Sequence, residues 1–335
     1  MKAVILEACA PIEEQPLRIV EIDRPRPGPG QLVIRVTACG VCRSNLHMIE
    51  GDWPGVPSTF PMIPGHEVVG VVDELGEGAD WMTVGDRVGV QPLWSTCGRC
   101  EYCLGGREQL CQTKQITGET VQGGYAEYML ADARHTHRLP DELEDVAAAS
   151  LFCPGITAYG SVLKARLDPT KRVAVFGVGG VGHVVLQMAR LWGASVVAVT
   201  RGAQHLALAE ELGAERAIDA SREDPIAELQ AMGGADASIV FAPSATFIGQ
   251  ALEATKPGGT VVLGVNGRFD RFPFANEKTV VGSLLGTRRQ MDEVLALAAA
   301  GKIRIVHEQH PLEEAQETLA RLKRGEIEAR AVLTP

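Results

Sequence analysis

The opening of the chain alternates between apolar and polar positions. The alternation runs through KAVILE, QPLRIVEI and QLVIRVTA, and the turn-rich stretch DRPRPGPG separates the last two runs. A period of two, bounded by proline and glycine, is typical of short, half-buried β-strands. Two further short runs, VVGVVDELG and VGDRVGVQP, follow the same pattern. Residues 1–150 are therefore predicted to form an irregular, mostly β domain.

From residue 146 onward the pattern changes to a mixture of helix and strand. The stretch VAAASLFCPGITAYGSVLKAR has helical spacing on both sides of a break that we predict at Cys153, Pro154 and Gly155. Beyond Lys171, apolar runs alternate with helical segments; the runs are KRVAVF, SVVAVT, DASIVFA, GTVVLGV and TVVGSLLG. This alternation predicts an α/β fold with a doubly wound parallel sheet across residues 151–286. Two helix-like segments and a last apolar run, ARAVLTP, end the chain.

A glycine-rich turn joins the first of these strands to the first helix. It consists of Gly177, Val178, Gly179, Gly180, Val181 and Gly182. Glycines at these spacings permit a tight turn, close approach of a pyrophosphate and close packing of helix on strand. The strand and helix on either side give the motif its proper context. The sequence therefore predicts a dinucleotide site that includes Gly177, Gly179, Gly180, Val181 and Gly182.

The next strand ends at Thr200, about 20 residues past the fingerprint, where NAD-binding proteins carry an acidic residue. Here the residue is neutral, and Arg201 follows it. A hydroxyl can donate to a 2′-phosphate and a guanidinium can pair with it. We therefore expect NADP(H) to be preferred over NAD(H). The alternative is that Arg201 is a solvated loop cation and that both cofactors are used.

Four of the eight cysteines lie in the cluster CGRCEYCLGGREQLC, at positions 97, 100, 103 and 111. Such spacing can wrap one tetrahedral ion, and an all-thiolate set leaves no position for a substrate. Cys97, Cys100, Cys103 and Cys111 are therefore predicted to hold a structural zinc ion. An iron–sulfur cluster and a redox dithiol are the alternatives.

A second set of candidate ligands begins with Cys42 and His66. Thiolate and imidazole suit zinc, and three protein ligands leave one position open for chemistry. Cys153 is our candidate for the third ligand, since Cys9 lies in an opening strand and Cys39 is too close to Cys42. Alone, a cysteine and a histidine 24 residues apart are a weak signal, because a buried cysteine is usually a small hydrophobe.

Two further polar residues lie between these candidate ligands. Ser44 and His47 could pass a proton from a buried metal site to water. Outside this stretch, His135 and His137 stand among arginine and threonine, and we expect both to be solvated rather than ligating.

Composition narrows the class of protein further. The 335 residues carry a formal charge of −10 without a basic run, which argues against nucleic acid or an anionic membrane as partner. No uninterrupted apolar stretch reaches the length of a membrane-spanning helix, and the acidic N-terminus is unlike a signal peptide. The cysteine cluster favours metal over disulfides. A cytoplasmic enzyme is expected.

Taken together, these motifs closely resemble the zinc-containing alcohol dehydrogenases of the medium-chain dehydrogenase/reductase family. The resemblance covers essentially the whole chain and is carried by CGVCRSNLH, PGHE, the four-cysteine lobe at about 95–112, CPGITAYG and GVGGVG. It implies a GroES-like catalytic domain made of residues 1–150 and 287–335, and a Rossmann domain between them. It also implies a cleft for zinc and cofactor, and a homodimer or homotetramer.

The same resemblance implies roles for individual residues. Cys42, His66 and Cys153 correspond to the ligands of the catalytic zinc, with Glu67 beside them, and Ser44 and His47 correspond to the proton relay. Expected cofactor contacts are Arg43 at the pyrophosphate, Thr157 at the nicotinamide, Val265 and Arg288. Trp53 and Trp94 would line the substrate pocket, although Trp94 could simply pack beside the cysteine lobe. One departure is Asn45, since the family usually carries aspartate there, near the histidine ligand; we expect an intact site of altered basicity.

The predicted reaction is the reversible interconversion of an alcohol with an aldehyde or ketone. Zinc would polarise the substrate oxygen, Ser44 and His47 would carry the hydroxyl proton away, and hydride would pass to or from the nicotinamide. A polyol dehydrogenase and a zinc-free quinone reductase are rival enzymes, and the quinone reductase lacks both zinc sites. A zinc- and nicotinamide-binding redox sensor is the non-enzymatic rival, but a sensor needs no proton path.

Overall fold

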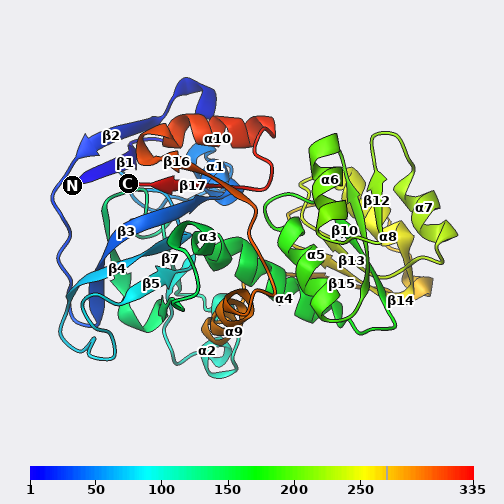
Figure 1. Ribbon diagram of the computed structural model, residues 1–335, viewed down its shortest axis with the longest axis horizontal. Helices are drawn as coiled ribbons and strands as arrows, with labels where there is room; N and C mark the ends of the chain where they lie inside the picture. Colours follow the sequence, from blue (N-terminus) through cyan, green and yellow to red (C-terminus); the bar gives the residue numbers. More distant parts are fainter. Residues whose placement is uncertain (269–270) are drawn as a thin grey trace. The chain divides into compact units, whose positions relative to one another are not determined.

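The computed structural model describes residues 1–268 and 271–335. The chain divides into two compact units (Figure 1). Unit 1 consists of Met1–Cys153, Thr287–Ala300 and Ile305–Pro335, and unit 2 of Pro154–Gly286 and Gly301–Arg304. Both ends of the chain therefore lie in unit 1.

Unit 1 is built mainly of strands, as the alternating pattern predicts. Its central sheet has the order β16-β17-β3-β4-β5-β9, with β8 also paired to β3. The strands of unit 1 are β1 (Lys2–Leu6), β2 (Leu17–Glu21), β3 (Gln31–Val41), β4 (Val68–Leu75), β5 (Arg87–Val90), β6 (Leu93–Ser95), β7 (Gln115–Ile116), β8 (Tyr128–Asp132), β9 (Thr136–Arg138), β16 (His307–Pro311) and β17 (Arg330–Thr334). Its helices are α1 (Arg43–Glu50), α2 (Glu101–Leu104), α3 (Asp145–Ala149), α9 (Arg288–Ala299) and α10 (Ala315–Arg324), with short 3₁₀ turns that include η2 (Glu108–Leu110) and η3 (Ala133–His135).

The long strand β3 organises this unit. It pairs antiparallel with β4, β8 and the last strand β17, with Val332 opposite Gly40. Its apolar positions are buried, including Leu32, Val33 and Ile34 at 0% exposure. Pairing of β17 with β3 is what brings residues from the end of the chain next to the Cys39–Cys42 segment.

Unit 2 is a doubly wound parallel sheet of six strands in the order β12-β11-β10-β13-β14-β15. This is the strand order of the Rossmann fold, and it confirms the predicted α/β class. Its strands are β10 (Arg172–Phe176), β11 (Ser195–Thr200), β12 (Arg216–Asp219), β13 (Ala235–Val240), β14 (Thr255–Leu263) and β15 (Thr279–Gly282). Its helices are α4 (Ile156–Ala165), α5 (Gly182–Leu191), α6 (Ala203–Glu211), α7 (Pro225–Ala231) and α8 (Ala245–Ala254).

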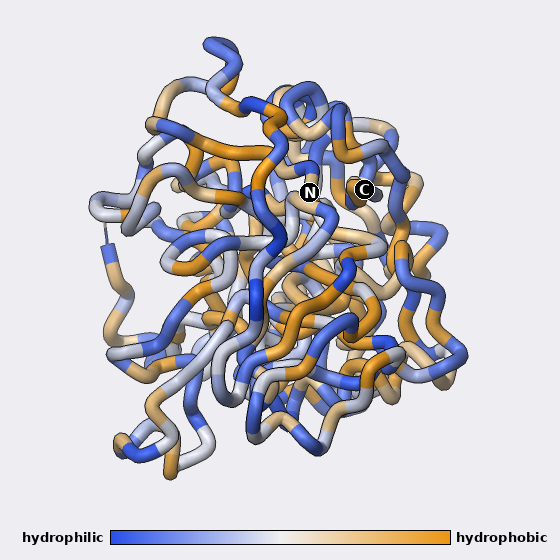
Figure 2. Tube along the Cα trace, turned by 90° about the vertical axis from the view of Figure 1, so that its left-hand side faces the viewer, coloured by the Kyte–Doolittle hydropathy of each residue, from blue (hydrophilic) through white to orange (hydrophobic). Residues whose placement is uncertain are grey.

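The core of each unit follows the apolar runs. Figure 2 shows orange, apolar stretches in the interior of the trace and blue, polar positions in several outer loops. In β10, the four residues from Val173 to Phe176 are all 0% exposed, because helices cover both faces of a parallel sheet.

The sequence predicts a break between two helices at Cys153, and this prediction is wrong, because the helical path continues through that residue. The structure has a π-helical turn, η4 (Leu151–Gly155), which contains Pro154 and joins α3 to α4. A proline has no N–H to donate and its ring clashes with the preceding turn, and a wider turn relieves both problems. The resulting helix, Asp145–Ala165, has the length and hydropathy of a membrane span. However, 78% of its most apolar 18-residue stretch is buried inside the fold, as in a core helix.

The expectation that His135 and His137 are solvated is also wrong. Their exposures are 2% and 5%. Nε2 of His135 lies 3.2 Å from Oγ1 of Thr96, and Nδ1 of His137 lies 2.7 Å from Oδ1 of Asp292. Polar neighbours in the sequence were misleading, because η3 and β9 turn both rings into unit 1.

The two leucines of α5 offer a matched test of this fold. Leu186 is 0% exposed, whereas Leu191 is 41% exposed at the end of the same helix. We expect Leu186→Ala to lower the free energy of unfolding by about 2–5 kcal/mol, because it leaves a cavity. Leu191→Ala should change it by less than about 0.5 kcal/mol. Denaturant unfolding of both variants checks this, and equal effects would contradict the packing of α5.

Candidate metal centre and cofactor site

Three segments of unit 1 bring the predicted catalytic ligands together. Cys42 is the N-cap of α1, His66 lies two residues before β4, and Cys153 lies in the π-helical turn η4. The exposures of Cys42, His66 and Cys153 are 7%, 1% and 7%. Their ligand atoms, together with a carboxylate oxygen of Glu67, all lie within 4.8 Å of one another.

The geometry and chemistry of this cluster fit zinc. The sulfur atoms of Cys42 and Cys153 are 3.8 Å apart. Two thiolates at about 2.3 Å from a tetrahedral ion are separated by about 3.8 Å. Among the described residues, Nε2 of His66 and Oε2 of Glu67 are buried without a hydrogen-bond partner. Buried polar atoms almost always have a partner, so an unsatisfied imidazole nitrogen beside two thiols indicates a metal ligand.

The pKa values of the residues in this cluster depend strongly on one another. The hydrogen bond between the two thiols lowers the pKa of Cys42 well below its ordinary value and raises the pKa of Cys153 well above it. Burial lowers the pKa of His66, but the negative charges of Cys42, Glu67 and Glu119 together outweigh burial and raise it to about 9. Metal ligands must be deprotonated, so a bound divalent cation would remove these protons.

A buried ion pair joins this cluster to the last strand, β17. Glu67 and Arg330 are 0% and 4% exposed on their side chains, and a guanidinium nitrogen of Arg330 donates to Glu67. Nε of Arg330 also donates to Oγ of Ser150 at 3.3 Å. Burial raises the pKa of Glu67 to about 7 despite the arginine. We did not predict Arg330 from the sequence; the only signal was a lone arginine in an otherwise apolar last strand.

Asn45 lies against the imidazole of His66, the candidate ligand, as the family pattern implies. Its Oδ1 accepts from the backbone N–H of Cys42 at 3.2 Å and from the hydroxyl of Tyr125 at 3.1 Å. Its Nδ2 is 3.3 Å from Nδ1 of His66. The amide therefore both caps α1 and touches the ligand ring.

The predicted relay residues lie on α1. His47 has a side chain 33% exposed, with Nδ1 2.6 Å from Oδ2 of Asp52 and its ring 5.6 Å from that of Trp53. Ser44 is half-buried one turn earlier, and Arg43 is exposed at the first position of the helix. The roles of these residues stay predictions.

The second cluster is the cysteine lobe. The thiols of Cys97, Cys100, Cys103 and Cys111 form a second group whose ligand atoms lie within 4.8 Å of one another. Sγ of Cys103 is 3.9 Å from that of Cys97 and 3.5 Å from that of Cys100. A backbone hydrogen bond from Cys97 lowers the pKa of Cys111 to about 6, which favours the thiolate that a metal requires.

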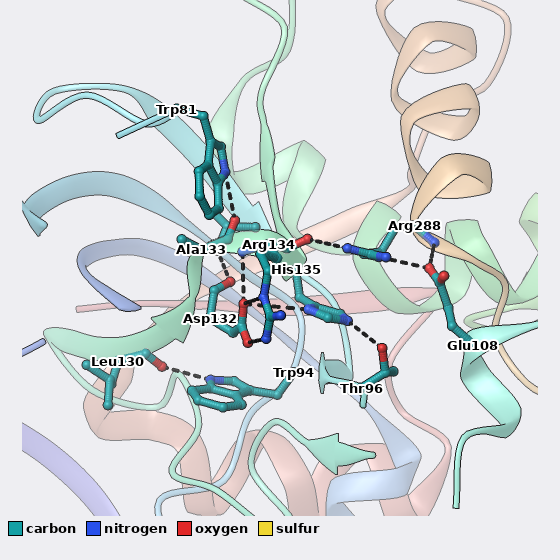
Figure 3. A network of polar contacts seen from close by, with 11 residues as sticks. Trp81, Trp94, Thr96, Glu108, Leu130, Asp132, Ala133, Arg134, His135 and Arg288 are labelled. Atoms are coloured by element: carbon teal, nitrogen blue, oxygen red, sulfur yellow. Dashed lines mark hydrogen bonds and ion pairs between the residues drawn. The ribbon is translucent and has the colours of Figure 1, made fainter. Parts of the chain in front are cut away.

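Arg288 and Trp94, which we predict to contact the cofactor and the substrate, both form hydrogen bonds within unit 1 (Figure 3). The backbone N–H of Arg288 donates to Oε1 of Glu108 at 2.8 Å and its Nε to the same atom at 3.0 Å. This ion pair ties the cysteine lobe to the start of α9. The indole N–H of Trp94 donates to the carbonyl of Leu130 at 3.0 Å, which holds β6 against β8. A cofactor role for Arg288 and a pocket role for Trp94 stay predictions.

In unit 2 the glycine fingerprint has the geometry that its sequence predicts. Gly177 has φ of 93°, a conformation that favours glycine. A Cβ on Gly182 would lie 1.8 Å from the carbonyl oxygen of Gly177, so only glycine allows helix α5 to start this close to β10. A Cβ on Gly179 would meet open space. That open position leaves the backbone accessible to a pyrophosphate.

The other predicted cofactor residues of unit 2 are spread over several elements. Thr200 ends β11 and is 3% exposed, while the exposed Arg201 has its guanidinium carbon 5.3 Å from the ring centre of Phe247. Val265 follows β14 and packs on the core of the unit, and Thr157 lies in the first turn of α4. Their contacts with a cofactor stay predictions.

Known proteins match the chain over its whole length. A family model for the alcohol dehydrogenase GroES-like domain matches residues 28–141, and one for the zinc-binding dehydrogenase matches residues 180–300. Alcohol dehydrogenases from Geobacillus stearothermophilus and Moraxella sp. (strain TAE123) are 39% and 40% identical, each over 99% of both chains.

Solved structures agree with these matches. The alcohol dehydrogenase of the hyperthermophilic archaeon Aeropyrum pernix has a TM-score of 0.93 at 33% identity, with all of both chains covered. A cobalt- and zinc-bound thermostable alcohol dehydrogenase from Pyrobaculum aerophilum has a TM-score of 0.90 at 30% identity, with 100% of this chain and 99% of that chain covered.

The fold, the two candidate metal clusters and these matches define a zinc-containing medium-chain dehydrogenase. The chain belongs to the alcohol dehydrogenases of that family, and it is a zinc-dependent oxidoreductase that acts on CH–OH groups. Its cofactors are zinc, with two candidate sites, and a nicotinamide dinucleotide.

The two clusters should hold one zinc ion each, because each offers a complete ligand set. Elemental analysis is expected to find two zinc ions per chain in the wild type and one in each of Cys153→Ser and Cys103→Ser. Cys153→Ser should abolish turnover with the smaller loss of thermal stability, and Cys103→Ser should show the larger loss of stability. The opposite pattern would mean that the two roles are exchanged, and a wild type with one or no zinc would contradict the assignment.

The buried ion pair gives a second test. Arg330→Met leaves Glu67 without its cation, so we expect the free energy of unfolding to fall by about 3–5 kcal/mol. Adding Glu67→Gln to that variant should recover most of the loss, because no buried charge remains unpaired. Denaturant unfolding of both single variants and the double variant measures this. If Arg330→Met lowers the free energy of unfolding by less than about 1 kcal/mol, the pair contributes no more than an ordinary surface ion pair, which would contradict this account.

Proposed function

We propose that the protein transfers a hydride reversibly between an alcohol and NADP⁺, with Cys42, His66 and Cys153 holding the catalytic zinc. The observation that carries this proposal is the unsatisfied Nε2 of His66 beside two buried thiols 3.8 Å apart. Three protein ligands leave a position for the substrate oxygen. The all-cysteine lobe leaves none, and its proposed role is structural.

When bound, zinc supplies Lewis-acid polarisation of the substrate oxygen and the nicotinamide supplies or accepts the hydride. The chain's own residues then have four tasks, of which proton transfer is the last. Glu67 and Arg330 keep a balanced, water-excluding charge pair beside the ligands. Gly177, Gly179 and Gly182 let the first turn of α5 bind the pyrophosphate, and Arg43 is proposed to contact it too. Thr157 and Val265 are proposed to position the nicotinamide.

Ser44 and His47 are proposed to move the hydroxyl proton to water. Nδ1–H of His47 donates to the Asp52 carboxylate, which orients the ring and leaves its Nε2 as the atom that exchanges a proton. A side chain that is one-third exposed can pass that proton to solvent, whereas the zinc ligands cannot. Trp53, whose ring is tilted by 34° against that of His47, is proposed to line the substrate pocket, and Trp94 is kept as a second candidate.

The proposed preference for NADP(H) rests on the end of β11. No carboxylate stands at position 200 to repel a 2′-phosphate, and Arg201 is exposed directly after it. The ring of Phe247 supports one face of its guanidinium, which reduces the freedom the side chain would lose on binding a phosphate.

We further propose a cytoplasmic homodimer or homotetramer. In the described part of the chain, β15 pairs only with β14 and so leaves one edge of the six-stranded sheet open. Apolar side chains near that strand are exposed, with Phe274 at 84% and Leu284 at 50%. An open edge with apolar neighbours fits a second copy of the chain.

The proposed reaction is tested with a panel of alcohols and aldehydes, followed by nicotinamide absorbance. We expect alcohol-dependent reduction of NADP⁺ and the reverse reaction with an aldehyde. Binding of zinc and nicotinamide without turnover of any member of the panel would favour a redox sensor.

Cofactor preference is tested by Thr200→Asp combined with Arg201→Ala. Hydrogen bonds to charged groups contribute about 1.5–3 kcal/mol, so we expect kcat/KM for NADP(H) to fall about 10- to 100-fold. The value for NAD(H) should be unchanged or raised. Arg289→Ala, which removes an arginine with an 89% exposed side chain from unit 1, is the control and should change neither value. A wild type that favours NAD(H), or an unchanged ratio in the double variant, would show that this loop does not set cofactor choice.

A further inference from the structure

The ligand ring of His66 has an unusual set of neighbours at its second nitrogen. A histidine that binds metal through Nε2 carries its proton on Nδ1, and that N–H needs an acceptor to fix the ring. Among residues 1–268 and 271–335, two side chains face Nδ1 of His66. Nδ2 of Asn45 is 3.3 Å away, and Oε1 of Glu119 is 3.9 Å away.

Asn45 is oriented the wrong way to serve as this acceptor. The backbone N–H of Cys42 can only donate, and it lies 3.2 Å from Oδ1 of Asn45. The hydroxyl of Tyr125 shares the same oxygen at 3.1 Å. Turning the amide over would take the acceptor away from both the Cys42 N–H and the Tyr125 hydroxyl, and it would break the cap of α1. The amide therefore presents nitrogen, a donor, to His66.

Glu119 is the carboxylate within reach. Its side chain is 14% exposed, and the loop that carries it is held against the segment before His66. Gly123 N donates to Ile63 O at 2.7 Å and Gly124 N to Gly65 O at 3.0 Å. At Gly118, φ is 70° and a Cβ would lie 2.8 Å from backbone atoms of Gly65, so the turn sits directly on the residue that precedes the ligand. A shift of about 1 Å brings Oε1 into hydrogen-bond range.

We propose that Glu119 is the positioning residue of the metal centre: its carboxylate accepts a hydrogen bond from Nδ1–H of His66 and fixes the ring for binding through Nε2. Asn45 caps α1 and cannot do so. The task that the family assigns to a carboxylate at position 45 has thereby moved to a different loop of this chain. The inference rests on the proposed role of His66 as a zinc ligand.

The rate of zinc release at constant neutral pH tests the proposal, because it depends on the metal centre and does not require turnover. The release of zinc to an excess of chelator is followed over time in the wild type, where each of the two sites should give one kinetic phase. The variant Cys42→Ser should show only the phase of the cysteine lobe and so identifies it. In Glu119→Gln we expect zinc of the His66 site to leave about 10- to 100-fold faster, with the other phase unchanged. Glu142→Gln, at an exposed glutamate far from His66 in the sequence, is the matched control and should behave as wild type.

Rescue separates positioning from general damage. Asn45→Asp keeps an oxygen for the Cys42 N–H and turns a second oxygen toward His66. Added to Glu119→Gln, it should restore zinc release to near the wild-type rate, and it should do so even if Glu119→Gln alone is too unstable to purify.

A wild-type rate in Glu119→Gln, or a double variant as fast as Glu119→Gln or equally unfolded, would overturn the proposal. A wild type that binds zinc at the cysteine lobe alone would instead overturn the proposed function.

Discussion

The structure depends on burying two thiols, an imidazole and a carboxylate within 4.8 Å of one another at exposures of 7% or less. Such a cluster is unfavourable unless its charges are balanced. Two thiolates and Glu67 bring three negative charges, and Arg330 with a divalent zinc ion would bring three positive ones. Balanced charges would stabilise the cluster, and its burial would strengthen the polarisation of a substrate oxygen.

The fold serves this cluster by bringing together segments that are far apart in the sequence. Strand β3 delivers Cys42 at the start of α1, β4 fixes the position of His66, and η4 projects Cys153 inward. Pairing of β17 with β3 then places Arg330 against Glu67, although 263 residues separate the two. The last strand thus contributes a side chain to the candidate metal centre as well as completing the sheet.

Local patterns predicted those features that depend on local structure. Five strands of the six-stranded sheet, the fingerprint glycines and the four-cysteine cluster could be predicted because strand, turn and ligand spacing are short-range signals. Cys42, His66 and Cys153 span 111 positions, and the family resemblance rather than local spacing brought them together. Arg330 and Glu119 could not be predicted, since their positions follow from strand pairing and from a loop docked on Gly65. Short, polar strands such as β12 and β16 carry too few apolar positions to be recognised. The burial of His135 and His137 likewise follows from tertiary packing and not from their neighbours in sequence.

The central claim is that zinc held by Cys42, His66 and Cys153 makes hydride transfer possible. The most direct measurement is reconstitution: zinc of this site is removed, the lobe zinc is retained, and alcohol-dependent reduction of NADP⁺ is followed as zinc is added back. The account predicts no turnover in the depleted protein and a linear return of activity that is complete when one zinc ion per chain has been restored. Full turnover in the depleted protein would contradict it.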